Sequence, residues 1–340
     1  MTRAAYITAD MVGTPTGGGG VTQNESLALT EFAGGDRCVV LDAKDLSPAV
    51  YQQPDSVFLP DYFALWGTRG RPLDLAHFYS GTFSQTVHDL HQKGVRVTYT
   101  VPAHDRSRTV EEFHRLGLVY PYPHIADPSL WVWFSQGYRE ADVVIAPSQA
   151  SAEFLQDEGC RDVRVIPHGH TPPAPDKVLP IGPQFAAGYL GQIGPDKGLV
   201  YLVRAWSELG DGQASLVIAG AGTDTLGSMI SGSAGHGRFS LLGWLPDKSQ
   251  LYNQVSVVVQ PSVCESFGIE VLEAWSYGRP VIVSQGAGVW ELVEEGVDGW
   301  VVPIRDPHAI AERLDWCRRH PVELRAMGEK GRQKSERYTW

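Results

Sequence analysis

Short apolar runs alternate with stretches of helical periodicity along the chain. Runs rich in Val, Ile and Ala are typical of strands that are buried on both faces of a parallel sheet, with helices packed against each face. In the first half the pattern predicts strands at 4–8, 37–41, 96–101, 143–146 and 163–166. In the second half it predicts strands at 186–190, 214–219, 240–242, 256–260, 281–284 and 300–302. The sequence therefore predicts an α/β protein with two doubly wound, Rossmann-like halves.

A proline-rich stretch separates the two halves. Five of the thirteen residues in TPPAPDKVLPIGP, 171–183, are proline, which fixes φ and lacks an N–H group. We therefore predict an N-terminal domain at 1–170, a linker at 171–183 and a C-terminal domain at 184–340. Sheets of this kind bind ligands where their strands end, so we expect the two domains to face a central cleft.

Composition and charge exclude several classes of protein. The chain has 340 residues, of which 43% are hydrophobic and 20% charged, and this composition is typical of a folded protein. The formal net charge of −11 disfavours a nucleic-acid partner. We find neither a membrane-spanning run nor a secretory signal, and the four cysteines have no paired spacing. We therefore expect a soluble, cytoplasmic protein without membrane contact, zinc site or disulfide framework.

The stretch PSVCESFGIEVLEAWSYGRPVIVS, 261–284, places two glutamates around a predicted helix. Glu265 lies in the loop that follows the strand at 256–260, and Glu273 lies in the helix predicted at 266–277. Two alternatives remain open at this point. The glutamates could bind a ligand, or Glu265 could cap the helix while Glu273 faces the solvent.

The start of this predicted helix is suited to anions and hydroxyl oxygens. Gly268 has no side chain, so a ligand could approach the backbone closely. The N–H groups of Phe267, Gly268 and Ile269 come before the first intrahelical hydrogen bonds and would point into the loop.

A glycine-rich loop, GQIGPDKG at 191–198, follows the strand at 186–190. Gly191, Gln192 and Lys197 belong to this loop, and one lysine beside a helix N-terminus could hold a diphosphate. The turn AGAG at 219–222, which includes Gly222, would support that loop.

Four consecutive glycines follow the first predicted strand and lead into a helix: Gly17, Gly18, Gly19 and Gly20. They lack the GxGxxG spacing of a dinucleotide fold, which disfavours a dehydrogenase. A flexible glycine loop that closes on an acceptor or a diphosphate fits better.

A histidine and an aspartate also stand at a strand end in the first half. His104 and Asp105 follow the strand at 96–101. They form either an ordinary loop pair or a pair that contacts a sugar or a proton.

The stretch ESFGIEVLE, 265–273, resembles the Glu-x7-Glu motif of retaining glycosyltransferases of the family 4 type, which have the GT-B fold. The loop 191–198 resembles the phosphate-binding Gly-Arg-x-x-x-x-Lys-Gly loop of that family. The resemblance covers the second domain well and the first domain loosely. Two positions depart from the family pattern: Gln192 replaces an arginine, and His168 replaces an asparagine.

The resemblance implies an acceptor-side domain at 1–170 and a donor-side domain at 184–340, and it implies a role for each candidate residue. Glu273 would bind the ribose hydroxyls of a nucleotide, and Lys197 would bind its diphosphate. Glu265 and the N–H groups of residues 267–269 would hold the donor sugar. His104 would lie near that sugar from the opposite domain, and the four glycines at 17–20 near the diphosphate or the acceptor.

The implied reaction is a retaining hexosyl transfer from a UDP- or GDP-sugar to a hydroxyl acceptor. A sugar or small glycoside is favoured over a lipid as the acceptor, because the first half has no basic amphipathic helix. We find no DxD triad and no metal-ligand spacing, so neither a metal nor another cofactor is expected. A GT-B epimerase or phosphorylase, and a non-catalytic protein that binds sugar nucleotides, remain open as alternatives.

Overall fold

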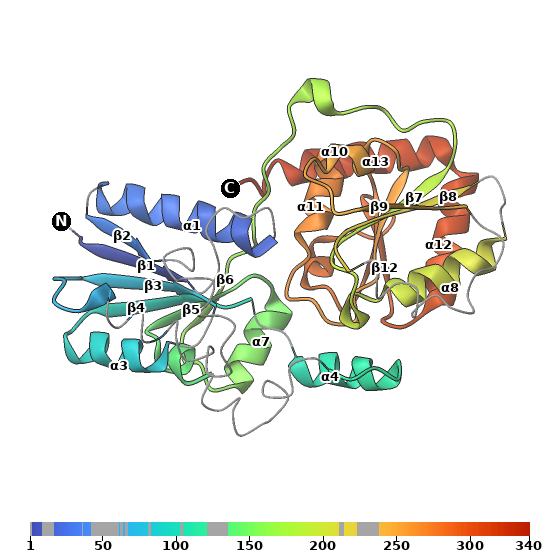
Figure 1. Cartoon of the computed structure of the whole chain (residues 1–340). Helices are drawn as coiled ribbons and strands as arrows, with labels where there is room; N and C mark the ends of the chain where they lie inside the picture. Colours follow the sequence, from blue (N-terminus) through green and yellow to red (C-terminus); the bar gives the residue numbers. More distant parts are fainter. Residues whose placement is uncertain are drawn as a thin grey trace. The chain divides into compact units, whose positions relative to one another are not determined.

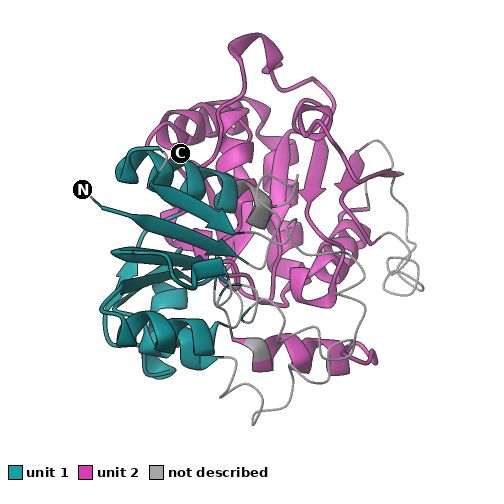
Figure 2. Ribbon diagram, turned by 60° about the vertical axis from the view of Figure 1, so that its left-hand side comes forward, with its two compact units in different colours: residues 1–103, 121–167 teal, residues 104–120, 168–340 magenta. Residues whose placement is uncertain are grey.

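The computed structural model describes residues 2–8, 17–35, 37–41, 61, 64, 67–80, 83–102, 105–120, 135–210, 214–222 and 238–340. The chain divides into two compact units (Figure 2). Unit 1 consists of Met1–Ala103 and Pro121–Pro167, and unit 2 of His104–Tyr120 and His168–Trp340.

Unit 1 contains a parallel sheet of six strands in the order β2-β1-β3-β4-β5-β6. The strands are β1 (Ala4–Thr8), β2 (Cys38–Leu41), β3 (Leu75–Tyr79), β4 (Arg96–Thr100), β5 (Val143–Ala146) and β6 (Val163–Val165). Helix α1 (Gly17–Ala33) covers one face, and α3 (Ser84–Gln92) and α7 (Gln149–Asp157) cover the other (Figure 1). The predicted doubly wound architecture of the first half is therefore confirmed.

Strand β3 was not expected from the hydrophobic pattern. Its sequence, LAHFY, places a polar residue, His77, in the middle of a buried strand. The imidazole is accommodated because its Nδ1 lies 2.8 Å from Thr98 Oγ1 and its ring stacks on Tyr6, with the ring centroids 5.6 Å apart. Cross-strand partners of this kind depend on pairing with β1 and β4, which the local sequence does not reveal.

Unit 2 contains a second parallel sheet of six strands, in the order β12-β11-β10-β7-β8-β9. The strands are β7 (Ala186–Leu190), β8 (Ser215–Ala219), β9 (Arg238–Gly243), β10 (Val257–Gln260), β11 (Val281–Ser284) and β12 (Gly299–Val302). Each of them coincides with a predicted strand to within two residues at either end. Adjacent residues of β10 lie in different cores, since Val257 and Val259 belong to one and Val258 to the other.

Helices bury both faces of this sheet (Figure 1). Helices α8 (Leu199–Leu209) and α12 (Pro307–Arg319) pack on one face, around the buried Trp206. Helices α10 (Ser249–Tyr252) and α11 (Ile269–Ser276) pack on the other, around the buried Trp275, and α13 (Pro321–Ser335) lies against α11. This arrangement places the loops after β7 and β10 next to each other at the carboxyl edge of the sheet.

The predicted start of the helix after β10 was wrong. Helix α11 begins at Ile269, three residues later than expected, and its N-cap is Gly268. Gly268 has a φ of 105°, in the left-handed region, so the right-handed helix cannot extend back through it.

The flexible glycine loop predicted in the first half was also wrong. The first turn of α1 is formed by the four glycines themselves: Gly17, Gly18, Gly19 and Gly20. Glycine disfavours a helix without forbidding it, and the residues that follow, up to Ala33, continue the helix from this turn.

The proline-rich stretch is bonded to unit 2. It contains a short 3-10 turn, η4 (Pro175–Lys177). The side-chain amide of Asn253 donates to the carbonyl of Lys177 and accepts from the N–H group of Leu179. The buried Arg279 donates to the carbonyl of Leu179 at 2.7 Å, so part of the predicted linker is fixed on the second unit.

The residues 104–120 lie between β4 and β5 in the sequence, yet they group with unit 2. They include helix α4 (Arg106–Arg115), which the Asp105 carboxylate caps by accepting from the N–H groups of Ser107 and Arg108. Among the described residues, no helix combines the length and apolar character that spanning a membrane requires.

Candidate functional site

Two strand-exit loops of unit 2 are joined by their backbones. The loop 191–198 follows β7, and the loop 261–268 follows β10, its neighbour in the sheet. The N–H groups of Val263 and Cys264 both donate to the carbonyl of Asp196, at 2.7 and 3.2 Å. These bonds fix the two loops as one structural element.

Gly198 allows the closest approach between these loops. Its φ is 67°, and a Cβ atom built on it would lie 2.0 Å from the carbonyl oxygen of Pro261. A side chain at position 198 would therefore push the loops apart, as well as straining the backbone.

The junction brings Lys197 and Glu265 into an ion pair. Their side chains are only 20% and 18% exposed, and Asp196 lies 3.8 Å from the same ammonium group. Burial opposes the charge of Lys197, but Glu265 and Asp196 outweigh it and raise the pKa of the lysine above its ordinary value. Lys197 therefore remains a cation at the point where the sequence predicts a diphosphate.

The backbone of Glu265 is fixed on a second side by the segment that follows β11. Its N–H group donates to the carbonyl of Gly286 at 2.8 Å, and its own carbonyl accepts from Gly288 at 3.0 Å. The N-cap residue of α11 is Gly268, so Glu265 is not the N-cap residue of this helix. The Glu265 carboxylate pairs with Lys197.

Glu273 lies in α11 and is held by two groups near α10. Its Oε1 accepts from the ammonium group of Lys248, and its Oε2 accepts from the hydroxyl of Tyr252 at 2.9 Å. The glutamate side chain is 18% exposed. The alternative that Glu273 is a solvent-facing helix acid is therefore also wrong.

A third carboxyl group, Glu270, acts on both ion pairs. Burial, followed by the charges of Glu265 and Glu273, raises its pKa from 4.5 to about 7. Its charge acts in turn on Lys197 and Lys248, and its backbone carbonyl accepts from Tyr252 at 3.3 Å. Glu270 therefore gains or loses its proton near neutral pH, and its charge acts on both the Lys197–Glu265 pair and the Lys248–Glu273 pair.

The residues at the start of α11 adjoin this cluster. Phe267 is buried, and the edge of its ring contacts the ring of His168, with the centroids 5.4 Å apart. Gly268 and Ile269 form the N-cap and the first residue of the helix, whose first N–H groups precede the intrahelical hydrogen bonds.

The loop after β7 also contacts the turn that follows β8. A Cβ at Gly220 would lie 1.7 Å from the carbonyl oxygen of Gly191, and the N–H group of Ile193 donates to Ala221 at 2.8 Å. Gly222, with a φ of 97°, lies close to the Ile193 carbonyl. Gln192 is exposed, and its backbone carbonyl accepts from Tyr189 at 2.7 Å.

The structure does not test the candidates from the first half of the chain. The four glycines belong to α1 of unit 1, namely Gly17, Gly18, Gly19 and Gly20. His104 lies outside the described residues. The structure therefore brings together Lys197, Glu265 and Glu273 with the loop glycines, and leaves the other predicted roles as predictions.

Four residues of the cluster were missed by sequence reasoning: Asp196, Lys248, Tyr252 and Glu270. Glu270 stands three residues before Glu273, so its place on the same side of α11 could have been inferred from helical spacing. Lys248 and Tyr252 come from α10 and the residue before it, and only the tertiary packing places them at Glu273. Among the described residues, no group of three or more His, Cys, Asp or Glu side chains could hold a metal ion.

Two segments of the chain match family models of glycosyltransferases. Residues 184–319 match the family described as glycosyl transferases group 1, and residues 53–172 match glycosyltransferase family 4. An uncharacterized glycosyltransferase of Methanocaldococcus jannaschii is 37% identical over 133 residues, which cover 37% of this chain and 34% of that protein. The chain thus spans about a third of the length of this curated relative.

Solved structures share the fold at low sequence identity. A sucrose-phosphate synthase from Thermosynechococcus elongatus superposes with a TM-score of 0.79 at 18% identity, over 99% of this chain and 95% of that chain. The HepE protein of Anabaena, solved in complex with UDP-glucose, gives a TM-score of 0.70 at 20% identity, over 98% and 95%. The expected GT-B fold of two Rossmann-like domains is confirmed.

The close approach at Gly198 can be tested by comparing it with Gly210, which ends α8. Gly210 has a similar φ of 63°, but a Cβ built on it would lie 4.0 Å from its nearest heavy atom, the Glu208 carbonyl oxygen. We expect Gly198→Ala to lower the free energy of unfolding by at least ~2 kcal/mol more than Gly210→Ala does. Urea denaturation of both variants measures this difference, and equal losses would contradict the backbone contact with Pro261.

The raised pKa of Glu270 predicts a dependence of stability on pH. The pKa of Glu270 is 4.5 in the unfolded state and about 7 in the folded state, so the folded state binds the proton more tightly. The free energy of unfolding should therefore fall as the pH rises from about 4.5 to about 7. Glu270→Gln should therefore be more stable than the unsubstituted protein at pH 8, by about 1–3 kcal/mol. The gain should shrink as the pH falls towards 5 in urea denaturation.

A matched control is Glu329→Gln. Arg332 lowers the pKa of the Glu329 carboxyl group, so this variant should show no gain at pH 8. A stability difference for Glu270→Gln that does not change with pH would show that Glu270 does not titrate in this range.

Proposed function

We propose that this protein transfers a hexose from a nucleotide-sugar donor, a UDP- or GDP-sugar, to a hydroxyl group of an acceptor. The transfer would proceed with retention at the anomeric carbon, and neither a metal nor another cofactor would be required. The observation that carries this proposal is the Lys197–Glu265 pair at the junction of the loops after β7 and β10. This junction provides a cation, a hydroxyl-binding carboxylate and a helix N-terminus at the carboxyl edge of one sheet.

Each charged group would have a separate role. Breaking the bond between sugar and phosphate develops negative charge on the departing diphosphate, which Lys197 would stabilise. Glu265 would accept hydrogen bonds from hydroxyls of the donor sugar, and Glu273 from the ribose hydroxyls. Because both carboxyl groups are paired with lysines, they are suited to accept such bonds.

The ion pair at the junction predicts an exchange of partners when the donor binds. In the structure Lys197 is committed to Glu265. A diphosphate carries more negative charge than one carboxylate, so it would replace Glu265 as the partner of the lysine. Glu265 would then be released to bind the sugar, which couples binding of the diphosphate to recognition of the sugar.

The reaction itself would be a front-face displacement. The departing diphosphate would take the proton from the acceptor hydroxyl as the new bond to the anomeric carbon forms. His104 and the glycines at 17–20 would contribute from the first half of the chain. A sugar or small glycoside is the acceptor that we propose, and the nucleotide-sugar donor is supported by the relationship in fold to HepE, which was solved with UDP-glucose.

Release of the nucleoside diphosphate from a panel of UDP- and GDP-sugars tests this function. We expect release with one donor in the presence of a mixture of sugar acceptors, and an unchanged rate when EDTA is added. Nuclear magnetic resonance of the product should show the anomeric configuration of the donor. Inversion, or a loss of activity with EDTA that is restored by a divalent metal, would contradict the proposed mechanism.

The same panel distinguishes the alternative functions. An epimerase would convert the nucleotide sugar without an acceptor, and a phosphorylase would require inorganic phosphate. Absence of release with every donor would indicate a binding protein without catalytic activity.

A further inference from the structure

Helix α4 packs on the unit that carries the candidate site. It lies between two strands of the unit 1 sheet in the sequence, but residues 104–120 group with unit 2 (Figure 2). The helix contacts η5 (Pro195–Lys197), the short turn that carries Lys197. Leu116, just beyond the helix, packs against the core around α8 and α12.

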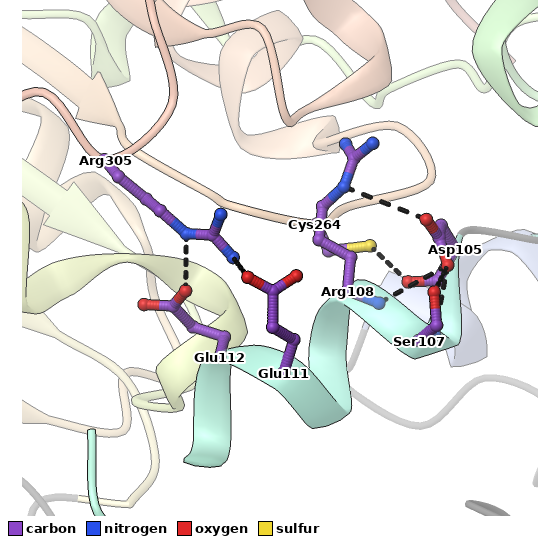
Figure 3. Close-up of polar contacts among 7 residues, drawn as sticks. All are labelled: Asp105, Ser107, Arg108, Glu111, Glu112, Cys264 and Arg305. Carbon is purple, nitrogen blue, oxygen red and sulfur yellow. Dashed lines mark hydrogen bonds and ion pairs between the residues drawn. The ribbon is translucent and has the colours of Figure 1, made fainter. Parts of the chain in front are cut away.

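A buried carboxylate anchors α4. Glu112 is fully buried, and it accepts from the hydroxyl of Tyr201 on α8. It also accepts from Arg305 Nε at 2.6 Å (Figure 3). Burial, followed by Glu112, raises the pKa of Tyr201 to about 12, so the phenol remains a hydrogen-bond donor. A second guanidinium nitrogen of Arg305 lies 3.4 Å from Glu111. Since an unpaired buried carboxylate is costly, these partners determine where α4 docks.

The first turn of α4 is held beside Glu265. The thiol of Cys264, the residue before Glu265, donates to the carbonyl of Asp105 at 3.1 Å (Figure 3). Burial raises the pKa of this thiol to about 11, so it is protonated and able to donate at neutral pH. Both loops of the candidate site therefore contact α4.

The candidate site carries more acidic than basic groups. Lys197 and Lys248 interact with four carboxyl groups, those of Asp196, Glu265, Glu270 and Glu273. A diphosphate would add at least two further negative charges to this cluster. Gln192, in the loop after β7, is exposed and neutral. Further positive charge is therefore needed for the diphosphate to bind well.

Arg108 is a cation of α4 that lies next to the loop after β10. Its side chain extends from the first turn of the helix past Cys264 (Figure 3). The side chain is 41% exposed, and its ion-pair partner among the described residues is Asp105, at 3.9 Å on the same helix. Its charge acts on the Cys264 thiol and opposes part of the rise in pKa that burial causes. The guanidinium is thus weakly held and close to the residue that precedes Glu265.

We propose that α4 is part of the donor site, and that Arg108, positioned by the Glu112 anchor, supplies a second positive charge to the diphosphate of the donor. This inference rests on the proposed function, because it assumes that a nucleoside diphosphate binds at Lys197. A planar guanidinium is suited to two phosphate oxygens at once, and it cannot lose its charge at neutral pH.

Calorimetric titration with UDP and GDP tests Arg108 directly, with uridine and guanosine as uncharged counterparts. We expect Arg108→Gln to weaken binding of the preferred diphosphate about tenfold, which corresponds to about 1.4 kcal/mol. Its nucleoside should bind within about twofold of the unsubstituted protein, because the charge acts on the phosphates. The matched control is Arg332→Gln, since Arg332 is 43% exposed and pairs with Glu329 three residues before it, and it should bind both ligands unchanged.

A rescue variant tests whether the charge of Arg108, and not the shape of its side chain, strengthens diphosphate binding. Gln192→Arg places a positive charge in the loop after β7, and in the Arg108→Gln background it should restore most of the lost diphosphate affinity. Unchanged diphosphate binding by Arg108→Gln would overturn the role of Arg108 while leaving the proposed function intact. An unsubstituted protein that binds neither UDP nor GDP would overturn both.

The anchor is tested by Glu112→Gln against Asp298→Asn. Asp298 is a buried carboxyl group that pairs with Lys334, so both substitutions remove the charge of a buried ion pair in unit 2. At a temperature where both variants are folded by circular dichroism, only Glu112→Gln should weaken diphosphate binding. Equal affinities for the two variants would show that docking of α4 does not position Arg108.

Discussion

The carbonyl of Asp196 is the contact on which the candidate site depends, because it accepts from the N–H groups of both Val263 and Cys264. These two bonds, with the close approach of Gly198 to Pro261, join the exit loops of neighbouring parallel strands. Neither loop alone would place a lysine against a glutamate. The sheet order brings the loops to one edge, and their backbones then fix the distance between the charged side chains.

This constraint explains why the cluster can hold several acids close together. Lys197 and Lys248 each pair with one glutamate, and Glu270 can take up a proton near neutral pH instead of adding a full charge. The result is a site whose cations are already engaged before a ligand arrives. An anionic ligand must compete for these cations, and this competition couples its binding to the release of a carboxylate.

The strands were the most predictable part of the fold, because a strand buried on both faces leaves a short apolar run in the sequence. Strand β3 does not follow this rule, because His77 lies at its centre and has its polar partners on β4 and α1, which are distant in the sequence. The loop residues of the site were predictable from glycines and charges that follow strands. The docking of α4 could not be predicted in this way. Glu112 binds Tyr201 and Arg305, which lie 89 and 193 residues further along the sequence.

Nucleotide affinity measured alongside turnover tests whether Glu265 and Glu273 have the separate roles that we propose at the loop junction. Glu265→Ala should keep or increase diphosphate affinity, because Lys197 loses its competing partner, while turnover falls at least about tenfold. Glu273→Ala should instead weaken nucleotide binding about tenfold through loss of the ribose contacts. Unchanged nucleotide affinity in Glu273→Ala, together with unchanged turnover in Glu265→Ala, would contradict the account.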